Sequence, residues 1–337
     1  MSETTSGPGA KVRWGILGAA SIARGQFLPA LRETGDGRAV IVGSRDCRRG
    51  EAFAAAEGVE RVTDSYEAVL GAEIDAVYIA LPNALHARWT IAALQAGLAV
   101  LCEKPLCATV ADTDTVIAAA REHPQAPLWE AFVFPFQAQH LRLLALLRDG
   151  AIGDPAELWS GFHFRLSGSD NIRHSAALGG GALADVGCYP IRLAHELFGP
   201  AGGRTGVTGV IEGEVDVEAA GFVEHDTRRL LFGCGFRRPF DTLARVLGDG
   251  GELRLSNPFH PGPNDGLELH RAGEEVVVER PTTDARSFTA ALRHIHAVVR
   301  EQEAPRHLAS ESAPSTARSL ASLQAQLRAA TPSQAPA

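Results

Sequence analysis

Short apolar runs alternate with amphipathic stretches in the first third of the chain. Residues 76–81 (AVYIAL), for example, have no polar face, which is typical of a strand buried on both sides of a sheet. The apolar runs predict strands at 12–17, 40–42, 76–81 and 99–102. The amphipathic stretches predict helices at 22–32, 51–57, 86–96 and 109–122. Strands that alternate with helices indicate right-handed crossovers and a parallel, doubly wound sheet.

The pattern changes near Leu128, beyond which strands follow one another with few helices between them. A polar, glycine-containing loop is expected at 166–181. The strands predicted here are 157–165, 206–212, 218–224, 229–234, 243–247, 252–255 and 274–279. The helices predicted here are 141–148, 184–197, 287–301 and 315–329. Consecutive strands joined by turns indicate an antiparallel sheet.

A chain of 337 residues is usually too long for one hydrophobic core, so we expect two domains. The predicted fold class is α/β, with a Rossmann doubly wound parallel sheet followed by a C-terminal α+β domain that has a mostly antiparallel open sheet. The predicted bounds are 11–128 and 129–330, with disordered tails at 1–10 and 331–337. An open sheet face is commonly covered by another subunit, so we expect a homodimer or homotetramer.

The net charge of -8 argues against a nucleic-acid partner or an anionic membrane surface, because no basic run compensates it. Arginines occur singly or in pairs such as Arg48–Arg49, as expected of solvated surface. No stretch is long and apolar enough to span a bilayer, and the N-terminal residues lack the apolar core of a signal peptide. The five cysteines have neither CxxC nor zinc-ligand spacing, so we expect reduced thiols, no metal and a cytoplasmic location.

A dinucleotide-binding turn follows the first predicted strand. It has the form Gly18-x-Ala20-x-x-Ala23, with alanine at the second and third glycine positions of the fingerprint. Such a turn brings the backbone close to a pyrophosphate and aims a helix N-terminus at it. The residues expected to bind the cofactor here are Gly18, Ala19, Ala20, Ser21 and Ile22.

The end of the second strand bears on which cofactor is used. An NAD site usually places Asp or Glu there for the ribose 2′-hydroxyl, whereas this strand ends in Ser44 and Arg45. A hydroxyl and a guanidinium suit a 2′-phosphate, so the sequence favours NADP over NAD. The alternative is that Arg45 is a solvated turn residue and that Asp46 holds the ribose.

Lysine and tyrosine are both rare in this chain, which contains two lysines, thirty arginines and three tyrosines. Lysine can be tuned by burial and neighbours whereas arginine cannot, so Lys104, just after an apolar strand, is a candidate for proton chemistry. Tyr189 lies on a predicted helix that is entered through three glycines, where the backbone bends or approaches a ligand. The alternatives are chance placement for the lysine and ordinary aromatic packing for the tyrosine.

Four segments together carry a family resemblance: the turn, 81–86 (LPNALH), 103–105 (EKP) and 179–190 (GGGALADVGCYP). With these in order along nearly the whole chain, the sequence resembles the Gfo/Idh/MocA oxidoreductases. It most resembles the branch that holds glucose–fructose oxidoreductase, NADP-dependent xylose dehydrogenases, dimeric dihydrodiol dehydrogenase and sugar-nucleotide 3-ketoreductases. The segment 171–173 (NIR) is typical of that branch.

The resemblance implies roles for individual residues. Lys104 would hold the reacting oxygen beside the nicotinamide, and Tyr189 would exchange a proton with that oxygen. Asp185, four residues before Tyr189 and so on the same helix face, would orient the substrate or the lysine. Asn171 and Arg173 would bind substrate, the alternative being a solvated loop. Further cofactor contacts implied by the resemblance are Leu81, Pro82, Asn83, His86, Glu103, Lys104 and Pro105.

We therefore expect an NADP-dependent oxidoreductase that acts on a hydroxyl or carbonyl carbon of a pyranose sugar or cyclic diol. The alternative is the NADPH-dependent reduction of a 3-keto sugar nucleotide during deoxysugar assembly. An NAD(P)-binding sensor without catalysis is a third hypothesis, although a pure binder would need neither Lys104 nor Tyr189.

Overall fold

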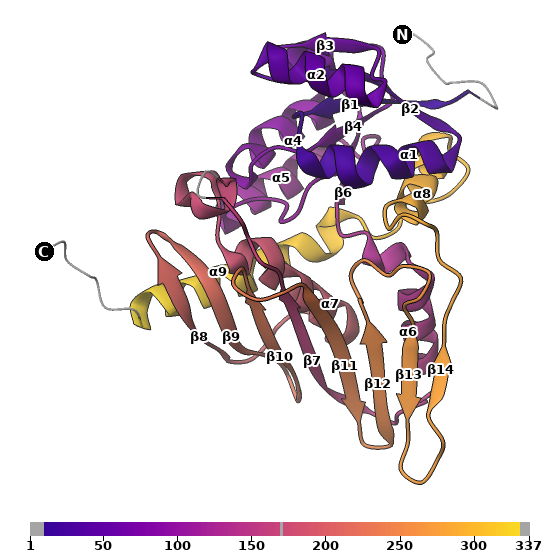
Figure 1. The fold of residues 1–337 in the computed structure, drawn as a ribbon, viewed down its shortest axis with the longest axis vertical. Helices are drawn as coiled ribbons and strands as arrows, with labels where there is room; N and C mark the ends of the chain where they lie inside the picture. Colours follow the sequence, from indigo (N-terminus) through magenta and orange to yellow (C-terminus); the bar gives the residue numbers. More distant parts are fainter. Residues whose placement is uncertain (1–9, 169–170, 331–337) are drawn as a thin grey trace, which may run out of the picture. The chain divides into compact units, whose positions relative to one another are not determined.

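The computed structural model describes residues 10–168 and 171–330 (Figure 1). Within them, six strands form a parallel sheet in the order β3-β2-β1-β4-β5-β6. The strands are β1 (Val12–Leu17), β2 (Gly37–Gly43), β3 (Arg61–Thr63), β4 (Ala76–Ile79), β5 (Ala99–Cys102) and β6 (Leu128–Glu130). Strand β4 is buried throughout, as its unbroken apolar pattern predicts. The predicted doubly wound parallel sheet is confirmed.

Helices connect these strands. The first is a π-helical turn, Ala23–Phe27, that continues into α1 (Leu28–Thr34). The others are α2 (Cys47–Glu57), α3 (Tyr66–Leu70), α4 (His86–Gln95) and α5 (Val110–Glu122), with 3₁₀ turns at Asn83–Leu85 and Phe134–Phe136. The sequence pattern missed β3, α3 and β6, because each has only three to five residues and so shows no periodicity.

A second sheet has the order β14-β13-β12-β11-β7-β10-β9-β8. Every neighbouring pair in it is antiparallel except β7 and β10, which run parallel. The strands are β7 (Pro155–His163), β8 (Thr205–Glu212), β9 (Val215–His225), β10 (Arg228–Gly235), β11 (Asp241–Gly248), β12 (Gly251–Ser256), β13 (Leu267–His270) and β14 (Val277–Glu279). The predicted, mostly antiparallel sheet is confirmed, and β13 is the strand that the pattern missed.

Helix α7 (Cys188–Phe198) packs against β7 and β10 and continues a π-helical turn, Leu183–Gly187. It covers the inward residues of the sheet, such as Leu158 and Leu230, which are fully buried. Helix α6 (Ala138–Arg148) and most of helix α9 (Ala309–Ala330) belong to the same compact unit as this sheet. Short 3₁₀ turns at Ile172–His174 and Ala176–Leu178 lie in the predicted loop before the glycines.

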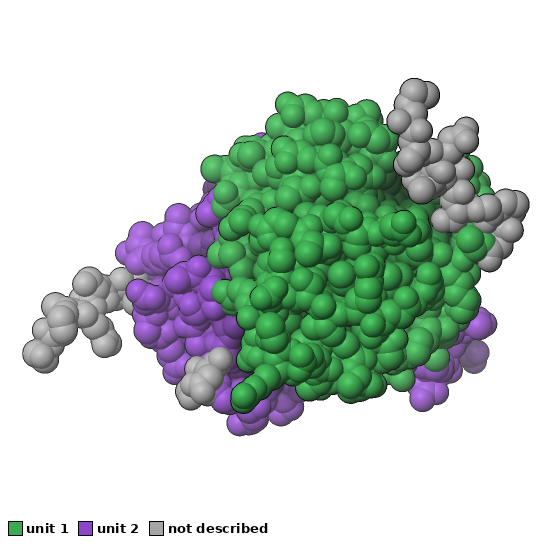
Figure 2. Space-filling view, turned by 90° about the horizontal axis from the view of Figure 1, so that it is seen from above, with its two compact units in different colours: residues 1–107, 111–136, 284–311 green, residues 108–110, 137–283, 312–337 purple. Residues whose placement is uncertain are grey.

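The chain divides into two compact units (Figure 2). Unit 1 contains residues 1–107, 111–136 and 284–311, and unit 2 contains 108–110, 137–283 and 312–337. Helix α8 (Thr289–Val299) packs against α1 in unit 1, and Glu33 accepts a 2.6 Å hydrogen bond from the Thr289 hydroxyl. The units are therefore discontinuous in sequence, while the domain boundary predicted at 128/129 stays a prediction. The predicted tails lie outside the described residues, Ala10 excepted.

A search of the helices in the described ranges finds none with the length and apolar character that crossing a membrane requires.

Candidate active site

The predicted phosphate-binding turn lies between β1 and the π-helical turn of unit 1. Gly18 has a φ of +101°, and a Cβ on it would lie 2.6 Å from the carbonyl oxygen of Ala80. Its amide donates to the Gly43 carbonyl at 2.9 Å, which ties the turn to the end of β2. Only glycine fits both this backbone conformation and this space. The helix that follows begins at Ser21, as the fingerprint requires.

An arginine that sequence reasoning placed on solvated surface contacts this turn. The guanidinium of Arg49 donates from Nε and Nη2 to the carbonyl oxygen of Ala19, at 3.1 and 2.9 Å. Asp46 caps α2, accepting from the Arg49 amide at 3.1 Å. Ser44 is buried and its hydroxyl donates to the Asp46 carbonyl at 2.9 Å, whereas Arg45 is exposed. In the sequence, Arg49 stood out only as one of a pair of arginines, Arg48–Arg49, and this pair did not indicate the contact with Ala19.

His86 connects the loops that follow β4 and β5. Its ring is fully buried, with Nε2 at 2.8 Å from the Leu81 carbonyl oxygen and Nδ1 at 3.0 Å from that of Pro105. Burial lowers the pKa of His86 against the opposing effect of these carbonyls, and the positive charge of Lys104 lowers it further. A neutral imidazole has one N–H, so it hydrogen-bonds one of the two carbonyls at a time. In the structure, His86 therefore lies between the backbones of the two loops. Its direct contact with the cofactor stays a prediction.

Two buried carboxylates lie beside the segment 103–106. Glu103 accepts a 2.6 Å hydrogen bond from the hydroxyl of Tyr78 on β4 and a 3.3 Å bond from the Lys104 amide. Glu130 on β6 accepts from the Leu106 amide at 2.7 Å. The peptide bond between Lys104 and Pro105 is cis, and Lys104 is half-buried. Hydrogen bonds from both sides thus fix the backbone on which the predicted catalytic lysine lies. Pro82 and Asn83 lie at the 3₁₀ turn before α4.

In unit 2, a buried aspartate holds the start of the helix that carries Asp185 and Tyr189. Asp216 on β9 accepts from the Leu183 amide at 2.6 Å. Gly181 has a φ of +110°, and a Cβ there would lie 2.5 Å from Oδ1 of Asp216. Burial raises the pKa of Asp216, opposed by its backbone hydrogen bonds. Gly181 therefore leaves room for this carboxylate at the helix N-terminus, a role that no sequence motif indicated.

The structure brings three predicted site residues together. Nε of Arg173 donates to Oδ2 of Asp185 at 2.6 Å, and Oδ1 of Asn171 accepts from the Arg173 amide at 3.1 Å. Asp185 lies in the π-helical turn, where hydrogen bonds span five residues rather than four. We predicted that Asp185 and Tyr189 share a helix face because they are four residues apart in an α-helix. The helix instead starts with a wider π-helical turn at Asp185.

Tyr189 lies in an aromatic cluster within unit 2. It is 5% exposed, and its ring centroid lies 5.2 Å from that of Phe162 and 5.0 Å from that of Phe259. Its hydroxyl is 3.4 Å from Nε2 of His260. Sequence reasoning missed His260, which lies between the strands predicted at 252–255 and 274–279 and has no motif of its own.

These residues can hold a dinucleotide in unit 1 and handle protons in unit 2. In the described parts of the chain, no group of three or more His, Cys, Asp or Glu side chains could hold a metal ion. The five cysteines are free thiols, and burial raises the pKa of Cys107 to about 12.

Two family models match the chain. The model for the oxidoreductase family with an NAD-binding Rossmann fold matches residues 12–132, and the GFO/IDH/MocA C-terminal domain matches residues 140–254. The first match contains all six strands of the parallel sheet, and the second contains β7 to β11 and the start of β12.

Individual relatives match over most of their length. A dTDP-3,4-didehydro-2,6-dideoxy-α-D-glucose 3-reductase from Streptomyces antibioticus is 36% identical over 87% of this chain and 90% of its own. A D-xylose 1-dehydrogenase (NADP+) from Haloferax volcanii is 34% identical over the same shares. The crystal structure of a 3-ketoreductase from Actinomadura kijaniata with NADP and TDP-benzene has a TM-score of 0.85, 29% identity, and covers 94% of this chain and 98% of its own. The resemblance inferred from the sequence motifs is thus confirmed, and the chain belongs to the Gfo/Idh/MocA family of oxidoreductases.

Proposed function

We propose that the protein is an NADP-dependent oxidoreductase acting on a hydroxyl or carbonyl carbon of a pyranose sugar or a cyclic diol. The observation that carries this proposal is the similarity, over 87% of the chain, to a xylose dehydrogenase that uses NADP+. The geometry of each unit supports it, since one has a dinucleotide turn and the other has a buried tyrosine paired with a histidine.

The residues present fit the cofactor. The turn at Gly18 leaves no room for a side chain, as the tight first turn of a dinucleotide site requires. Ser44 and Arg45 at the end of β2 would bind the 2′-phosphate, and Arg49 would support them by holding the turn at Ala19. Bound NADP supplies the hydride chemistry, while the protein supplies orientation and proton transfer. The remaining cofactor contacts that we propose are Ala20, Ser21, Ile22, Leu81, Pro82, Asn83, His86, Glu103, Lys104 and Pro105.

For catalysis, we propose that Oη of Tyr189 exchanges a proton with the reacting oxygen, and that Nζ of Lys104 holds that oxygen. A cation near a phenol lowers its pKa and so eases this exchange. Asp185 would orient the site through its ion pair with Arg173. Solved structures similar to this chain include variants of the Actinomadura kijaniata reductase with one lysine or one tyrosine replaced, which supports attention to these residue types.

We propose that the side-chain amide of Asn171 and the guanidinium of Arg173 bind the substrate. Both lie in a loop whose 3₁₀ turn is capped by Asn171, so their backbone is ordered before a ligand arrives. An amide both donates and accepts hydrogen bonds and a guanidinium donates them, so both groups can bind the hydroxyls of a sugar.

A second candidate is the reduction of a 3-keto sugar nucleotide. The observation that favours it is the series of 3-reductases among the relatives, which are 32% to 36% identical over 84% or more of this chain. Both candidates require the same Lys104 and Tyr189, and they differ in whether the substrate carries a nucleoside diphosphate.

The test is nicotinamide absorbance during NADP+ reduction with a panel of free aldopyranoses, cyclitols and trans-dihydrodiols, with NAD+ in parallel. Rapid reduction of NADP+ by one of them supports the first candidate. No reduction in the presence of any of them, with NADPH binding confirmed by fluorescence, supports the second. Faster turnover with NAD+ than with NADP+ would contradict the cofactor assignment.

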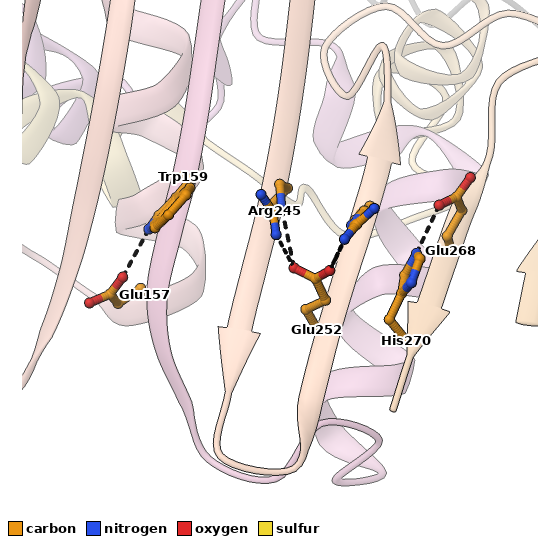
Figure 3. Close-up of polar contacts among 7 residues, drawn as sticks. Glu157, Trp159, Arg245, Glu252, Glu268 and His270 are labelled. Atoms are coloured by element: carbon orange, nitrogen blue, oxygen red, sulfur yellow. Dashed lines mark hydrogen bonds and ion pairs between the residues drawn. The ribbon is translucent and has the colours of Figure 1, made fainter. Parts of the chain in front are cut away.

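We also propose that the outward face of the second sheet pairs with a second copy of the chain. Figure 3 shows ion pairs and hydrogen bonds along this face, from Trp159 and Glu157 on β7 through Arg245 and Glu252 to Glu268 and His270 on β13. Acidic and basic groups neutralise one another there, so two identical faces would not repel. Trp159 and Leu243 add exposed apolar area, each 39% exposed. Light scattering that returns a monomer at micromolar concentration would contradict the proposal.

The absence of a nucleic-acid partner and a cytoplasmic location stay predictions.

A further inference from the structure

A histidine from a loop between β12 and β13 lies at the hydroxyl of Tyr189. Nε2 of His260 is 3.4 Å from Oη of Tyr189, and the two rings meet edge to face with centroids 5.4 Å apart. This distance is at the long end for a hydrogen bond. Such bonds are commonly long in a site without substrate and shorten when substrate binds.

Two aromatic rings pack against this pair. The rings of Phe162 and Phe259 stack with centroids 5.8 Å apart, and both pack against Tyr189. Phe162 also meets the His260 ring edge to face at 6.1 Å. In such an environment a hydrogen bond between a phenol and an imidazole is stronger than in water.

The loop that carries His260 is held by its own side chains. Nδ2 of Asn257 donates to the His260 carbonyl oxygen and, at 3.2 Å, to Oδ2 of Asp265. The same carboxylate accepts from the Gly262 amide at 2.8 Å, and Asn257 has a φ of +43°. The backbone of His260 is thus fixed from within the loop, which places the imidazole ring against Tyr189.

We propose that His260 is a relay residue that acts through Tyr189, supplying the proton that the tyrosine gives to substrate and removing it in the reverse direction. This inference rests on the proposed function. In reduction, the proton on Oη of Tyr189 moves to the substrate oxygen, whose carbon is reduced by the nicotinamide cofactor. The tyrosinate oxygen takes a proton from Nε2 of His260 in its imidazolium form, and the neutral imidazole that results regains a proton from solvent. Oxidation runs the same transfers backwards.

Imidazole suits this task because its ordinary pKa, near 6.5, lets it hold and release a proton around neutral pH. The ring contacts Tyr189 on α7 and Phe162 on β7. Within the loop, the charged group is Asp265, which is engaged with Asn257 and Gly262.

Two variants separate proton relay from packing. His260→Phe keeps an aromatic ring, and His260→Gln keeps a hydrogen-bonding amide that does not titrate. We expect kcat to fall roughly 10- to 100-fold in both, with KM changed less than about twofold and the limb of the pH–rate profile that reports the imidazole lost. His123→Gln, at a half-exposed histidine after α5, is the control and keeps the wild-type profile. Wild-type kcat and profile in His260→Phe would overturn the proposal.

A spectroscopic measurement needs no cofactor or substrate. The chain has three tyrosines, so labelling tyrosine at Cζ with a stable carbon isotope gives three resonances, and Tyr189→Phe identifies one of them. In the wild type we expect the Tyr189 resonance to shift across the pH range over which an imidazole gains its proton, and this step to vanish in His260→Gln. A Tyr189 resonance that is flat across this range in the wild type would overturn the proposal.

The two measurements distinguish failure of the relay from failure of the proposed function. If no substrate is turned over by the wild type while the titration step is present, the coupled pair stands and the proposed function fails. If the wild type is active and both His260 variants match it, the relay fails and the proposed function stands.

Discussion

The indole Nε1 of Trp14 donates a 3.0 Å hydrogen bond to Nε2 of His296, although 282 positions separate the two residues. Nδ1 of the same ring lies 2.7 Å from a carboxylate oxygen of Asp36. Since Nε2 must accept, the ring proton lies on Nδ1, and the neutral tautomer of His296 satisfies both neighbours. Burial lowers the pKa of His296 accordingly. Helix α8 is thereby joined to the first strand of the parallel sheet.

Replacing Trp14 by Phe should destabilise unit 1. It leaves Nε2 of His296 buried without its donor, which costs about 1–3 kcal/mol in free energy of unfolding. Urea unfolding followed by circular dichroism measures the change. Trp159→Phe, on the outward face of the second sheet, is a matched control, because the exposed indole of Trp159 loses a hydrogen bond to Glu157 and stability should change much less. An equal decrease in the free energy of unfolding in both variants would show that the buried Trp14–His296 hydrogen bond does not stabilise the protein more than the exposed one.

Lys104→Met should abolish turnover while leaving NADPH binding measurable. The loss of a group that holds the reacting oxygen is expected to lower kcat by about 10²- to 10⁴-fold. Lys11→Met is the matched control, because Lys11 is the other lysine and is exposed at the start of β1. Stopped-flow absorbance gives kcat, and fluorescence titration gives the dissociation constant of NADPH. Unchanged turnover in Lys104→Met would remove the proposed role.

Gly18→Ala should weaken cofactor binding through the shape of the turn. A Cβ there lies 2.6 Å from a backbone carbonyl, and φ is +101°. Gly58→Ala is the control, since Gly58 also has a positive φ, +70°, but its Cβ would meet nothing within 4 Å. We expect both variants to lose stability, the control by about 1 kcal/mol, and only Gly18→Ala to lose NADPH affinity. Fluorescence titration that finds equal affinity in the two variants would contradict this reasoning.

Acid should destabilise the protein partly through His195 on α7. Burial, followed by the charge of the neighbouring His225, lowers the pKa of His195 to about 3. The folded state thus prefers the neutral ring, whose nitrogens lie 3.3 Å from the Gly199 carbonyl oxygen and 3.2 Å from the Ser319 hydroxyl. Because the folded pKa is below the unfolded one, this contribution is complete above pH 6.5 or so and is lost as pH falls toward 3.

The measurement is the urea-derived free energy of unfolding at a series of pH values, for the wild type and His195→Gln. Between about pH 6 and pH 4, the wild type should lose about 1.4 kcal/mol per pH unit more than the variant. Parallel curves for the two proteins would show that His195 takes up its proton equally in both states.

Much of the candidate site was predictable because its signals are local. The turn at Gly18, the position of Lys104 after an apolar strand and the glycines before Asp185 are all patterns within about a dozen residues. Arg49, Asp216 and His260 had no such signal. Arg49 reaches a carbonyl 30 positions away, and the Tyr189–His260 contact spans 71 positions. Such contacts arise from the packing of distant segments, which spacing within the sequence does not encode.

By itself, the sequence determined the family and the succession of a parallel sheet and a mostly antiparallel one, because apolar runs and glycines mark buried strands and turns. The short strands β3, β6 and β13 showed no such pattern. The tertiary structure decided which residues meet. Helix α8 belongs to the first unit, where the ring of His296 lies between Trp14 and Asp36. Gly181 makes room for the carboxylate of Asp216, and the loop residue His260 lies at the hydroxyl of Tyr189. Complementary shapes and unsatisfied hydrogen bonds select such partners only once the chain is folded.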